Sequence, residues 1–422
     1  MKTKLTFWRA VFCLIMAMGL YSVFVRYYYG IGAVSNMSDK FPWGIWIGFD
    51  VLCGVMLAAG AFIVTGAVYL LNIERLHSIA RPAVLTAFLG YVLVIVGLMF
   101  DLGRPWFIWH QLIYMNPHSV MFEVGFCVMF YTTVLLFEFS TTVLERFNLT
   151  KPLKIVKACL IPLVILGILL STLHQSSLGT LYLIMPTKLH PFWYTPALPF
   201  FFFISAVAVG LAMTIFESSL SSRAFGHQLE LPVIVELGGA LYVTLWVYAL
   251  LRFEDYLHRG LLGKILHPSY EAYFLWLELL LALIIPLVLL SFRRMRLSAT
   301  GLYVASCSTL LGFITNRLNV SITGFETWSG HHYYPRWTEA SLTAMIIALG
   351  FFIFGLAVKY LPIFDDAHHA PHALVTELAT LPETAHQPTL VHQPMVDGGA
   401  SAHGRRSHSS LEKQCSSGSS RG

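Results

Sequence analysis

Long apolar runs alternate along this chain with short polar connections. A helix needs about 20 mainly apolar residues to cross a bilayer. Ten stretches meet this requirement, at residues 8–28, 43–71, 83–102, 119–142, 155–175, 196–219, 233–256, 270–292, 298–318 and 338–362. The first stretch follows basic residues as a signal peptide would, but no small-residue cleavage site comes after it. The pattern therefore predicts an all-α polytopic membrane protein with about ten transmembrane helices, the first of them uncleaved.

The composition supports a membrane protein. Hydrophobic residues make up 56% of the chain and charged residues 12%, against roughly 25% charged residues in soluble domains. This excludes a water-soluble enzyme, and it excludes disorder of the whole chain. The net charge of +5 does not indicate a nucleic-acid partner. With a cytoplasmic N-terminus, more Lys and Arg fall on the inner side than on the outer side, so we expect both termini in the cytoplasm.

The composition changes after residue 364. Residues 365–422 contain no Phe, Trp or Tyr, and they carry seven of the 17 histidines together with many Ser, Pro and Gly residues. Such a segment cannot bury enough apolar surface to fold. We therefore divide the chain into a transmembrane helical domain, 1–364, and a disordered His- and Ser-rich cytoplasmic tail, 365–422.

Polar residues gather near the predicted outer face. A charge inside a bilayer costs about 2.5–3.5 kcal/mol on insertion scales, so each one needs a reason. Asp50, Arg104, His174 and Gln175 combine an acid, a cation, an imidazole and an amide at one depth. Such a set could hydrogen-bond and protonate an apolar ring with two carbonyl oxygens. The alternatives are structural: Asp50 could pair with an arginine such as Arg104, Arg104 could pair with Asp101, and His174 could be hydrogen-bonded structure.

Two further groups of polar residues have both functional and structural interpretations. His174 and Gln175 end the fifth predicted span, and the polar stretch after them suggests a broken or re-entrant segment that lines a cavity. Proton transfer along acidic side chains is the functional interpretation of Glu123, Glu278 and Glu236, and ion pairing or snorkelling is the alternative. For Glu138 and Glu217, near the inner interface, we expect snorkelling.

The sequence shows no redox centre of its own. Six cysteines are scattered without a CxxC pair, whereas an iron–sulfur cluster needs four thiolates. The histidines before the tail lie almost all in loops or at helix ends, so axial pairs for haem are not available. We therefore expect no haem, no iron–sulfur cluster and no other metal in this chain. Any electrons that it transfers must come from a partner.

Several motifs resemble a known family. They are Phe41-Pro42-Trp43-Gly44 continuing to Asp50 and Cys53, Asp101-Leu102-Gly103-Arg104-Pro105-Trp106, His174-Gln175-Ser176-Ser177-Leu178-Gly179, Arg317-Leu318-Asn319 and Tyr334-Pro335-Arg336-Trp337. In this order they resemble the NrfD-like family of quinone-interacting membrane subunits, which includes the polysulfide reductase membrane subunit. Within it, the HybB-type membrane subunit of periplasmic nickel–iron hydrogenase is especially similar. The likeness covers about residues 5–362 and leaves out the tail.

The resemblance implies a haem-free subunit, built from two four-helix bundles plus extra helices, in the bacterial inner membrane. It would pass electrons between a periplasmic iron–sulfur subunit, next to nickel–iron hydrogenase subunits, and menaquinone or ubiquinone, and it could also translocate protons. Trp43 and Trp106 would then form apolar walls around the quinone. The expected partner interface consists of His331, Tyr333, Tyr334, Arg336 and Trp337. The alternatives are a secondary transporter or proton translocator without a redox partner, and an anchor without a quinone site.

Overall fold

The chain is folded almost entirely into helices. The computed structural model describes residues 7–226 and 228–364, so the predicted tail lies outside the described residues, and within them there is no β-strand. The long helices are α1 (Phe7–Tyr29), α5 (His77–Asp101), α7 (Val120–Arg146), α9 (Leu160–Leu183), α10 (Leu198–Phe225), α11 (Leu231–His258), α16 (Ala299–Leu318) and α18 (Trp337–Tyr360). The prediction of an all-α polytopic membrane protein is confirmed.

Nine of the ten predicted spans are long and apolar enough to cross a membrane, counted over the described residues. The tenth, predicted at 298–318, is the helix α16, which is not among the nine. Its sequence contains several Ser and Thr residues and carries Asn316 and Arg317 in its last turn. Many of these side chains are buried against other helices and do not face lipid, so the segment can be helical without being strongly apolar.

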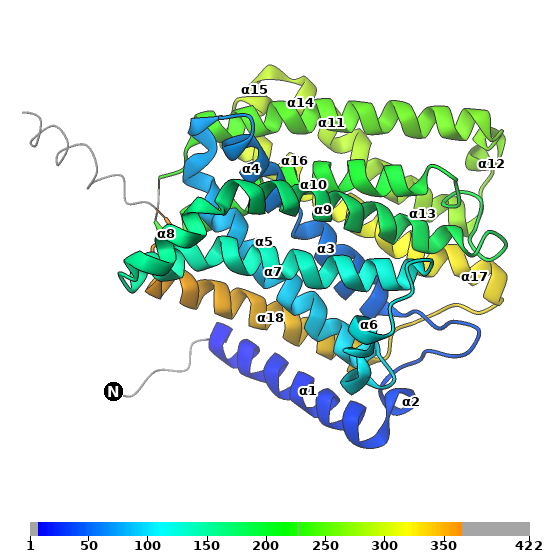
Figure 1. Ribbon diagram of the computed structural model, residues 1–422. Helices are drawn as coiled ribbons and strands as arrows, with labels where there is room; N and C mark the ends of the chain where they lie inside the picture. Colours follow the sequence, from blue (N-terminus) through cyan, green and yellow to red (C-terminus); the bar gives the residue numbers. More distant parts are fainter. Residues whose placement is uncertain (1–6, 227, 365–422) are drawn as a thin grey trace, which may run out of the picture. The chain divides into compact units, whose positions relative to one another are not determined.

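The helices form two four-helix bundles (Figure 1). In the first bundle, α3 (Leu52–Leu57) and α4 (Gly60–Tyr69) pack with α5, α7 and α9. In the second, α10 and α11 pack with α16 and with a broken helix made of α13 (Tyr270–Leu279), η4 (Leu280–Ile284) and α14 (Ile285–Ser291). Contacts of α10 with α9, α3 and α4 join the bundles, and the extra helices α1 and α18 pack together beside α5.

Two spans are interrupted by irregular turns. The second span begins with the π-helical η1 (Trp46–Val51), continues as α3, and breaks at Ala58 and Ala59 before α4. In the eighth span, the π-helical η4 lies just before Pro286, whose nitrogen cannot donate a helix hydrogen bond. Irregular backbone is tolerated at membrane depth where it is buried in protein. Ala58 and Ala59 are buried at the first break, and Ala282 and Leu283 are buried at the second.

The predicted break after residue 175 is wrong, because α9 continues to Leu183. The polar residues that suggested the break do not interrupt the helix: Ser176 Oγ donates to Thr172 O at 3.0 Å, and Ser177 Oγ, which donates to Glu123, lies 2.8 Å from Leu173 O. Gly179 allows close approach of α10, since a Cβ atom there would lie 2.6 Å from the Cα of Pro199. His174 and Gln175 are therefore mid-helix residues.

Short helices mark the two ends of the bundles. We call the end at which α2 (Ile31–Val34), α6 (His110–Ile113), α12 (Leu262–Leu266) and α17 (Gly324–Ser329) lie the loop end (Figure 1). The opposite end, which carries α8 (Thr150–Ala158), is the α8 end. The start of α1 and the end of α18 both lie at the α8 end. The remaining short segments are η2 (Glu74–Leu76), η3 (Pro105–Phe107), α15 (Arg293–Arg296) and the π-helical η5 (Asn319–Thr323).

Candidate functional site

A large apolar cavity of about 630 Å³ lies between the bundles and α18. Its wall is built by η1, α3, α5, α10, α16 and α18. Almost all of the lining side chains are apolar, and the carboxyl groups in the wall belong to Asp50 and Glu217. Volumes of 300–1,000 Å³, with mostly apolar walls and a few polar groups, are typical of ligand sites. The cavity therefore suits an apolar molecule that meets a carboxyl group.

Asp50 lies in η1 and is 6% exposed. Its Oδ2 accepts a hydrogen bond of 2.9 Å from Thr343 Oγ1 on α18. Its Cβ packs on Gly97 of α5, where an added methyl group would lie 2.9 Å away. The carboxyl group is thus held by one hydroxyl group and one glycine at the cavity wall. No ion pair joins it to a cation of residues 7–226 or 228–364, so the predicted alternative of an Arg104 partner is wrong.

His174 and Gln175 do not line this cavity. Gln175 Nε2 donates to Val55 O at 3.1 Å. That carbonyl oxygen lies in the turn before the helix break, where Ala59 N bonds to Met56 O and so leaves Val55 O without its usual helical donor. Gln175, on the neighbouring helix α9, thus supplies the hydrogen-bond donor that Val55 O lacks at the break. His174 is fully buried, and neither ring nitrogen has a hydrogen-bond partner in the described part of the chain.

A second buried polar group surrounds Glu278, which is 2% exposed. Its Oε1 accepts from Asn316 Nδ2 at 2.8 Å, and its Oε2 accepts from Trp193 Nε1 and Asn319 Nδ2, both at 2.9 Å. Arg317 Nη1 donates to Asn316 Oδ1 at 2.7 Å, and its guanidinium group lies 3.6 Å from the centroid of the Phe202 ring. Glu278 is therefore the acceptor that joins α13, α16, η5 and the segment before α10.

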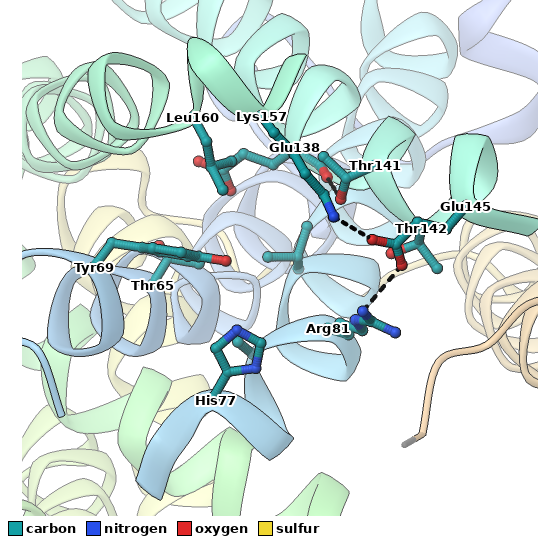
Figure 2. Close-up of a pocket in the computed structure, with 12 residues that line it drawn as sticks. Thr65, Tyr69, His77, Arg81, Glu138, Thr141, Thr142, Glu145, Lys157 and Leu160 are labelled. Carbon is teal, nitrogen blue, oxygen red and sulfur yellow. Dashed lines mark hydrogen bonds and ion pairs between the residues drawn. The ribbon is translucent and has the colours of Figure 1, made fainter. Parts of the chain in front are cut away.

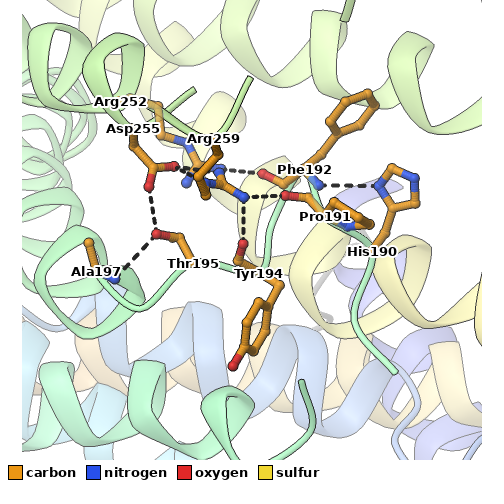
Figure 3. A network of polar contacts seen from close by, with 9 residues as sticks. All are labelled: His190, Pro191, Phe192, Tyr194, Thr195, Ala197, Arg252, Asp255 and Arg259. Atoms are coloured by element: carbon orange, nitrogen blue, oxygen red, sulfur yellow. Dashed lines mark hydrogen bonds and ion pairs between the residues drawn. The ribbon is translucent and has the colours of Figure 1, made fainter. Parts of the chain in front are cut away.

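Arginines at the end of α11 fix the segment that carries Trp193 (Figure 3). Arg259 Nη1 donates to the carbonyl oxygens of Pro191 and Tyr194, each at 2.6 Å. Arg252 Nη2 donates to Phe192 O at 3.1 Å. Burial lowers the pKa of His190 in this segment below its ordinary value. The Trp193 indole reaches Glu278 because these contacts hold the loop.

Arg104 and Trp106 lie at the protein surface. Arg104 is exposed and makes no ion pair or hydrogen bond with a described residue, so the expected alternative of an Asp101–Arg104 pair is also wrong. Trp106 is 62% exposed. Arg26 on α1 takes the place beside Asp101, and it donates to Phe100 O and Leu102 O, both at 2.6 Å. The structure thus brings neither Arg104 nor Trp106 to the buried side chains of Asp50 and His174.

Trp43 lies in a buried aromatic cluster at the loop end. Its ring meets the Tyr182 ring edge-on at 5.4 Å and the Phe325 ring at 6.0 Å. Tyr182 is fully buried, and its hydroxyl group has no hydrogen-bond partner among the residues that are described. The cluster joins α9 to α17 and does not line the apolar cavity. Sequence reasoning did not select Tyr182.

The expected partner interface is only partly exposed. His331, Tyr334, Arg336 and Trp337 are exposed at the loop end. Tyr333 is buried, because its hydroxyl group donates to Glu339 Oε1 at 2.6 Å and accepts from Ile45 N at 3.1 Å. Burial raises the pKa of Tyr333, and the hydrogen bond to Glu339 acts in the same direction. This residue therefore holds the loop to α18.

The acidic residues fall into different environments. Glu236 is partly exposed and pairs with Arg75 at 3.0 Å, whereas Glu123 is exposed and accepts a hydrogen bond from Ser177. The predicted snorkelling of Glu138 and Glu217 is wrong: Glu138 is 7% exposed, and Glu217 Oε1 is buried at the cavity wall. Both are held inside because neighbouring helices cover them.

Comparison with known proteins identifies the family. The family described as "Polysulphide reductase, NrfD" matches residues 33–329. This chain belongs to the NrfD family. A protein of Nitratidesulfovibrio vulgaris is 39% identical over 374 residues, covering 84% of this chain and 95% of its own length. The "Probable Ni/Fe-hydrogenase 2 b-type cytochrome subunit" of Escherichia coli K12 is 32% identical over 353 residues, covering 82% and 90%.

A further relative in N. vulgaris is the "Menaquinone reductase, integral membrane subunit". It is 30% identical over 394 residues, covering 86% of this chain and 93% of the relative. The NrfD match covers both bundles, from before η1 to the end of α17, and leaves out α1 and α18. In the described residues, no group of three or more His, Cys, Asp or Glu side chains could hold a metal ion. The prediction that this NrfD protein lacks haem and clusters stays a prediction.

Proposed function

We propose that this NrfD protein is the quinone-reactive membrane subunit of a respiratory complex of the nickel–iron hydrogenase type. The observation that carries the proposal is the apolar cavity with Asp50 in its wall. One relative is named as a menaquinone reductase subunit and another as a hydrogenase subunit, which supports both halves of the proposal. The quinone would be menaquinone or ubiquinone.

The residues of the cavity fit a quinone. A quinone supplies a ring that takes up electrons and protons together, and it carries a long apolar tail. The apolar side chains of α10, α16 and α18 would hold the tail, and the Asp50 carboxyl group would exchange a proton with the ring. Thr343 and Gly97 position this carboxyl group. His174 and Gln175, which we expected in the same site, lie outside the cavity wall.

A periplasmic iron–sulfur subunit would dock at the loop end, next to nickel–iron hydrogenase subunits. The loop end carries exposed aromatic side chains, which are typical of protein interfaces: Trp106, Trp109, Tyr114, Tyr334 and Trp337. Arg104 and Arg336 are exposed at the same end. In this proposal Arg104 and Trp106 contact the docked subunit, whereas the sequence had suggested that they contact the quinone.

We place the chain in the bacterial inner membrane with the loop end outside. The α8 end carries Lys151, Lys154 and Lys157 on α8 and three arginines on α15. Basic residues concentrate on the cytoplasmic side of membrane proteins. This orientation places both ends of the described helical domain, at α1 and α18, on the cytoplasmic side.

Two substitutions test the site in the purified complex. Asp50→Asn replaces the carboxyl group with an amide that cannot give up and take back a proton in this way, and it should abolish quinone reduction by the complex. Leu311→Trp should raise the KM for quinone, because Leu311 lines the cavity and is 55% exposed, so a larger side chain can extend across the cavity without repacking a core. Reduction of a soluble dye by the catalytic partner should remain unchanged in both variants.

Two matched controls accompany them. Glu236→Gln changes a carboxylate in a surface ion pair, and Leu250→Trp enlarges a side chain that is 61% exposed and does not line the cavity. Both should leave quinone reduction unchanged. Wild-type rates and KM values in Asp50→Asn and Leu311→Trp would refute the cavity as the quinone site. Purification of the chain without any iron–sulfur protein would refute the complex.

A further inference from the structure

We propose that α8 and the turn before it form a binding surface for anionic phospholipids of the surrounding bilayer. Lys151 and Lys154 contact the phosphate of the lipid head group, and exposed apolar side chains beside them contact its acyl chains. The inference does not depend on the quinone reaction, because it concerns the membrane surface at the α8 end and not the cavity.

α8 lies between the ends of two membrane-spanning helices. α7 ends at Arg146, α8 begins at Thr150, and α9 begins at Leu160. Both α7 and α9 are long and apolar enough to cross a membrane. Figure 1 shows α8 beyond the end of α9, and α8 packs against α7. Since both of its neighbours enter the bilayer at this end, α8 is within reach of the lipid head groups.

Basic and apolar positions separate around α8. Lys151, Lys154 and Lys157 follow one another at intervals of three residues, so successive lysines lie about 60° apart around the helix axis. Leu153, Ile155 and Val156 occupy the rest of the circumference. A short helix with lysines on one side and apolar residues on the other is typical of the interface between water and lipid.

The first two lysines carry positive charge that no described residue neutralises. Lys151 and Lys154 are exposed, and neither makes an ion pair or a hydrogen bond with a residue of 7–226 or 228–364. The sequence contains no Asp or Glu from residue 146 to residue 216. An anionic head group therefore complements this part of α8, and lysines near a membrane surface attract anionic lipids in this way.

Lys157 has a different role (Figure 2). Its Nζ lies 2.8 Å from Glu145 Oε1, and Arg81 Nη2 lies 3.0 Å from Glu145 Oε2. Each oxygen of the Glu145 carboxylate thus has a cation beside it. The pair with Lys157 holds α8 against the end of α7, which leaves Lys151 and Lys154 as the lysines that contact lipid.

The pocket beside this ion pair is not where the phosphate lies. The pocket has a volume of about 110 Å³, and its wall contains Glu138 as well as Glu145. A phosphate group inside it would lie next to two acidic side chains, and like charges repel one another. The phosphate therefore lies on the outer surface of α8.

Apolar side chains surround the lysines and favour a lipid over a soluble anion. Phe147 and Leu149, in the turn before α8, are 67% and 49% exposed, and Ile155 on α8 is 68% exposed. Ile161, at the start of α9, is 56% exposed. Side chains of this kind insert among acyl chains while neighbouring lysines extend to the phosphates. A soluble anion would pair with the lysines but would leave the apolar groups in water.

A fluorophore next to α8 tests the surface. It is attached to Cys159, which is exposed and directly follows the helix; Cys13, Cys307 and Cys415 are replaced by serine, and Cys53 and Cys127 are buried. Phosphatidylglycerol or phosphatidylcholine with a spin-labelled acyl chain is titrated into the purified full chain in neutral detergent. We expect phosphatidylglycerol to quench the fluorescence at a lower concentration than phosphatidylcholine.

The variant Lys151→Gln/Lys154→Gln should remove this preference. Its half-quenching concentration for phosphatidylglycerol should rise about 30-fold, since each lysine contributes about 1 kcal/mol and 1.4 kcal/mol is a factor of ten. The value for phosphatidylcholine should stay the same. The matched control is Lys40→Gln/Lys264→Gln, which removes two exposed lysines at the loop end and should keep the preference.

Four results would overturn the proposal. They are equal quenching by the two lipids before the lysines are changed, an unaltered preference in Lys151→Gln/Lys154→Gln, and loss of the preference in Lys40→Gln/Lys264→Gln, which would show an effect of net charge alone. The fourth is competition by inorganic phosphate at millimolar concentration, which would assign the lysines to a soluble anion.

Discussion

Glu278 should stabilise the fold as a hydrogen-bond acceptor and should not act as a proton carrier. Its carboxylate accepts one hydrogen bond from Asn316 on Oε1 and two on Oε2, from Trp193 and Asn319. In Glu278→Ala all three donors lose their acceptor. In Glu278→Gln the amide oxygen can take the place of Oε2 and keep two bonds. Asn316 cannot turn its amide to restore the third, because its Oδ1 accepts from Arg317.

Glu278→Gln therefore keeps two hydrogen bonds that Glu278→Ala loses, and its free energy of unfolding should be higher by the contribution of those two bonds. At the average of about 0.6 kcal/mol for a hydrogen bond in a membrane protein, the difference is about 1 kcal/mol. With values of about 1.5 kcal/mol for bonds to a charged acceptor, it is about 3 kcal/mol. Both variants lose the same negative charge near Arg317 and Arg252, so this loss cancels in the comparison.

Denaturant titration of the purified chain in detergent measures the free energy of unfolding of each variant. We expect the order wild type, Glu278→Gln, Glu278→Ala, with the last two separated by about 1–3 kcal/mol. Glu236→Gln, in an exposed ion pair, should change stability by less than about 1 kcal/mol. Equal stability of Glu278→Gln and Glu278→Ala would refute the acceptor role, and a wild-type value for Glu278→Ala would refute any structural role.

Three further substitutions follow from single contacts. Gly97→Ala should displace Asp50 and slow quinone reduction without loss of the partner on co-purification, because the new methyl group would lie 2.9 Å from Asp50 Cβ. Gln175→Leu should lower the free energy of unfolding by about 1–2 kcal/mol in denaturant titration, since Val55 O loses its donor. Tyr333→Phe should cost about 1–3 kcal/mol in the same assay, because Glu339 and Ile45 N both lose a partner. If a variant gave the wild-type value in its assay, the result would contradict the role of the contact that it removes.

The apolar pattern predicts where the membrane helices lie, but it does not predict where each helix ends or is interrupted. Apolar length locates a span because lipid requires every backbone polar group to bond within the helix. It misplaced the end of α9, since serine side chains inside the helix, such as Ser176, whose hydroxyl group bonds back to the backbone, read as polar interruptions. The apolar pattern also did not predict the break at Ala58 and Ala59. There Gln175, on another helix, donates a hydrogen bond to Val55 O.

The candidate site was predicted only in part. Asp50 was selected because an acid in a span is costly, and this reasoning does not depend on its neighbours. Depth suggests Arg104 for the same site, and the family resemblance suggests Trp106, but neither fixes the direction in which a side chain points. Sequence reasoning missed Thr343, which donates to Asp50, because a threonine in an apolar span carries no distinctive signal.

Local patterns are enough to predict a bundle of membrane helices of the NrfD type, because apolar length and family motifs can be read within single segments of the chain. The packing of the helices shows three further facts: Asp50 faces an apolar cavity, Glu278 accepts three hydrogen bonds, and His174 has no hydrogen-bond partner among the described residues. These facts depend on which helix faces pack together. Residues that are far apart in the sequence make those contacts, and no local pattern encodes them.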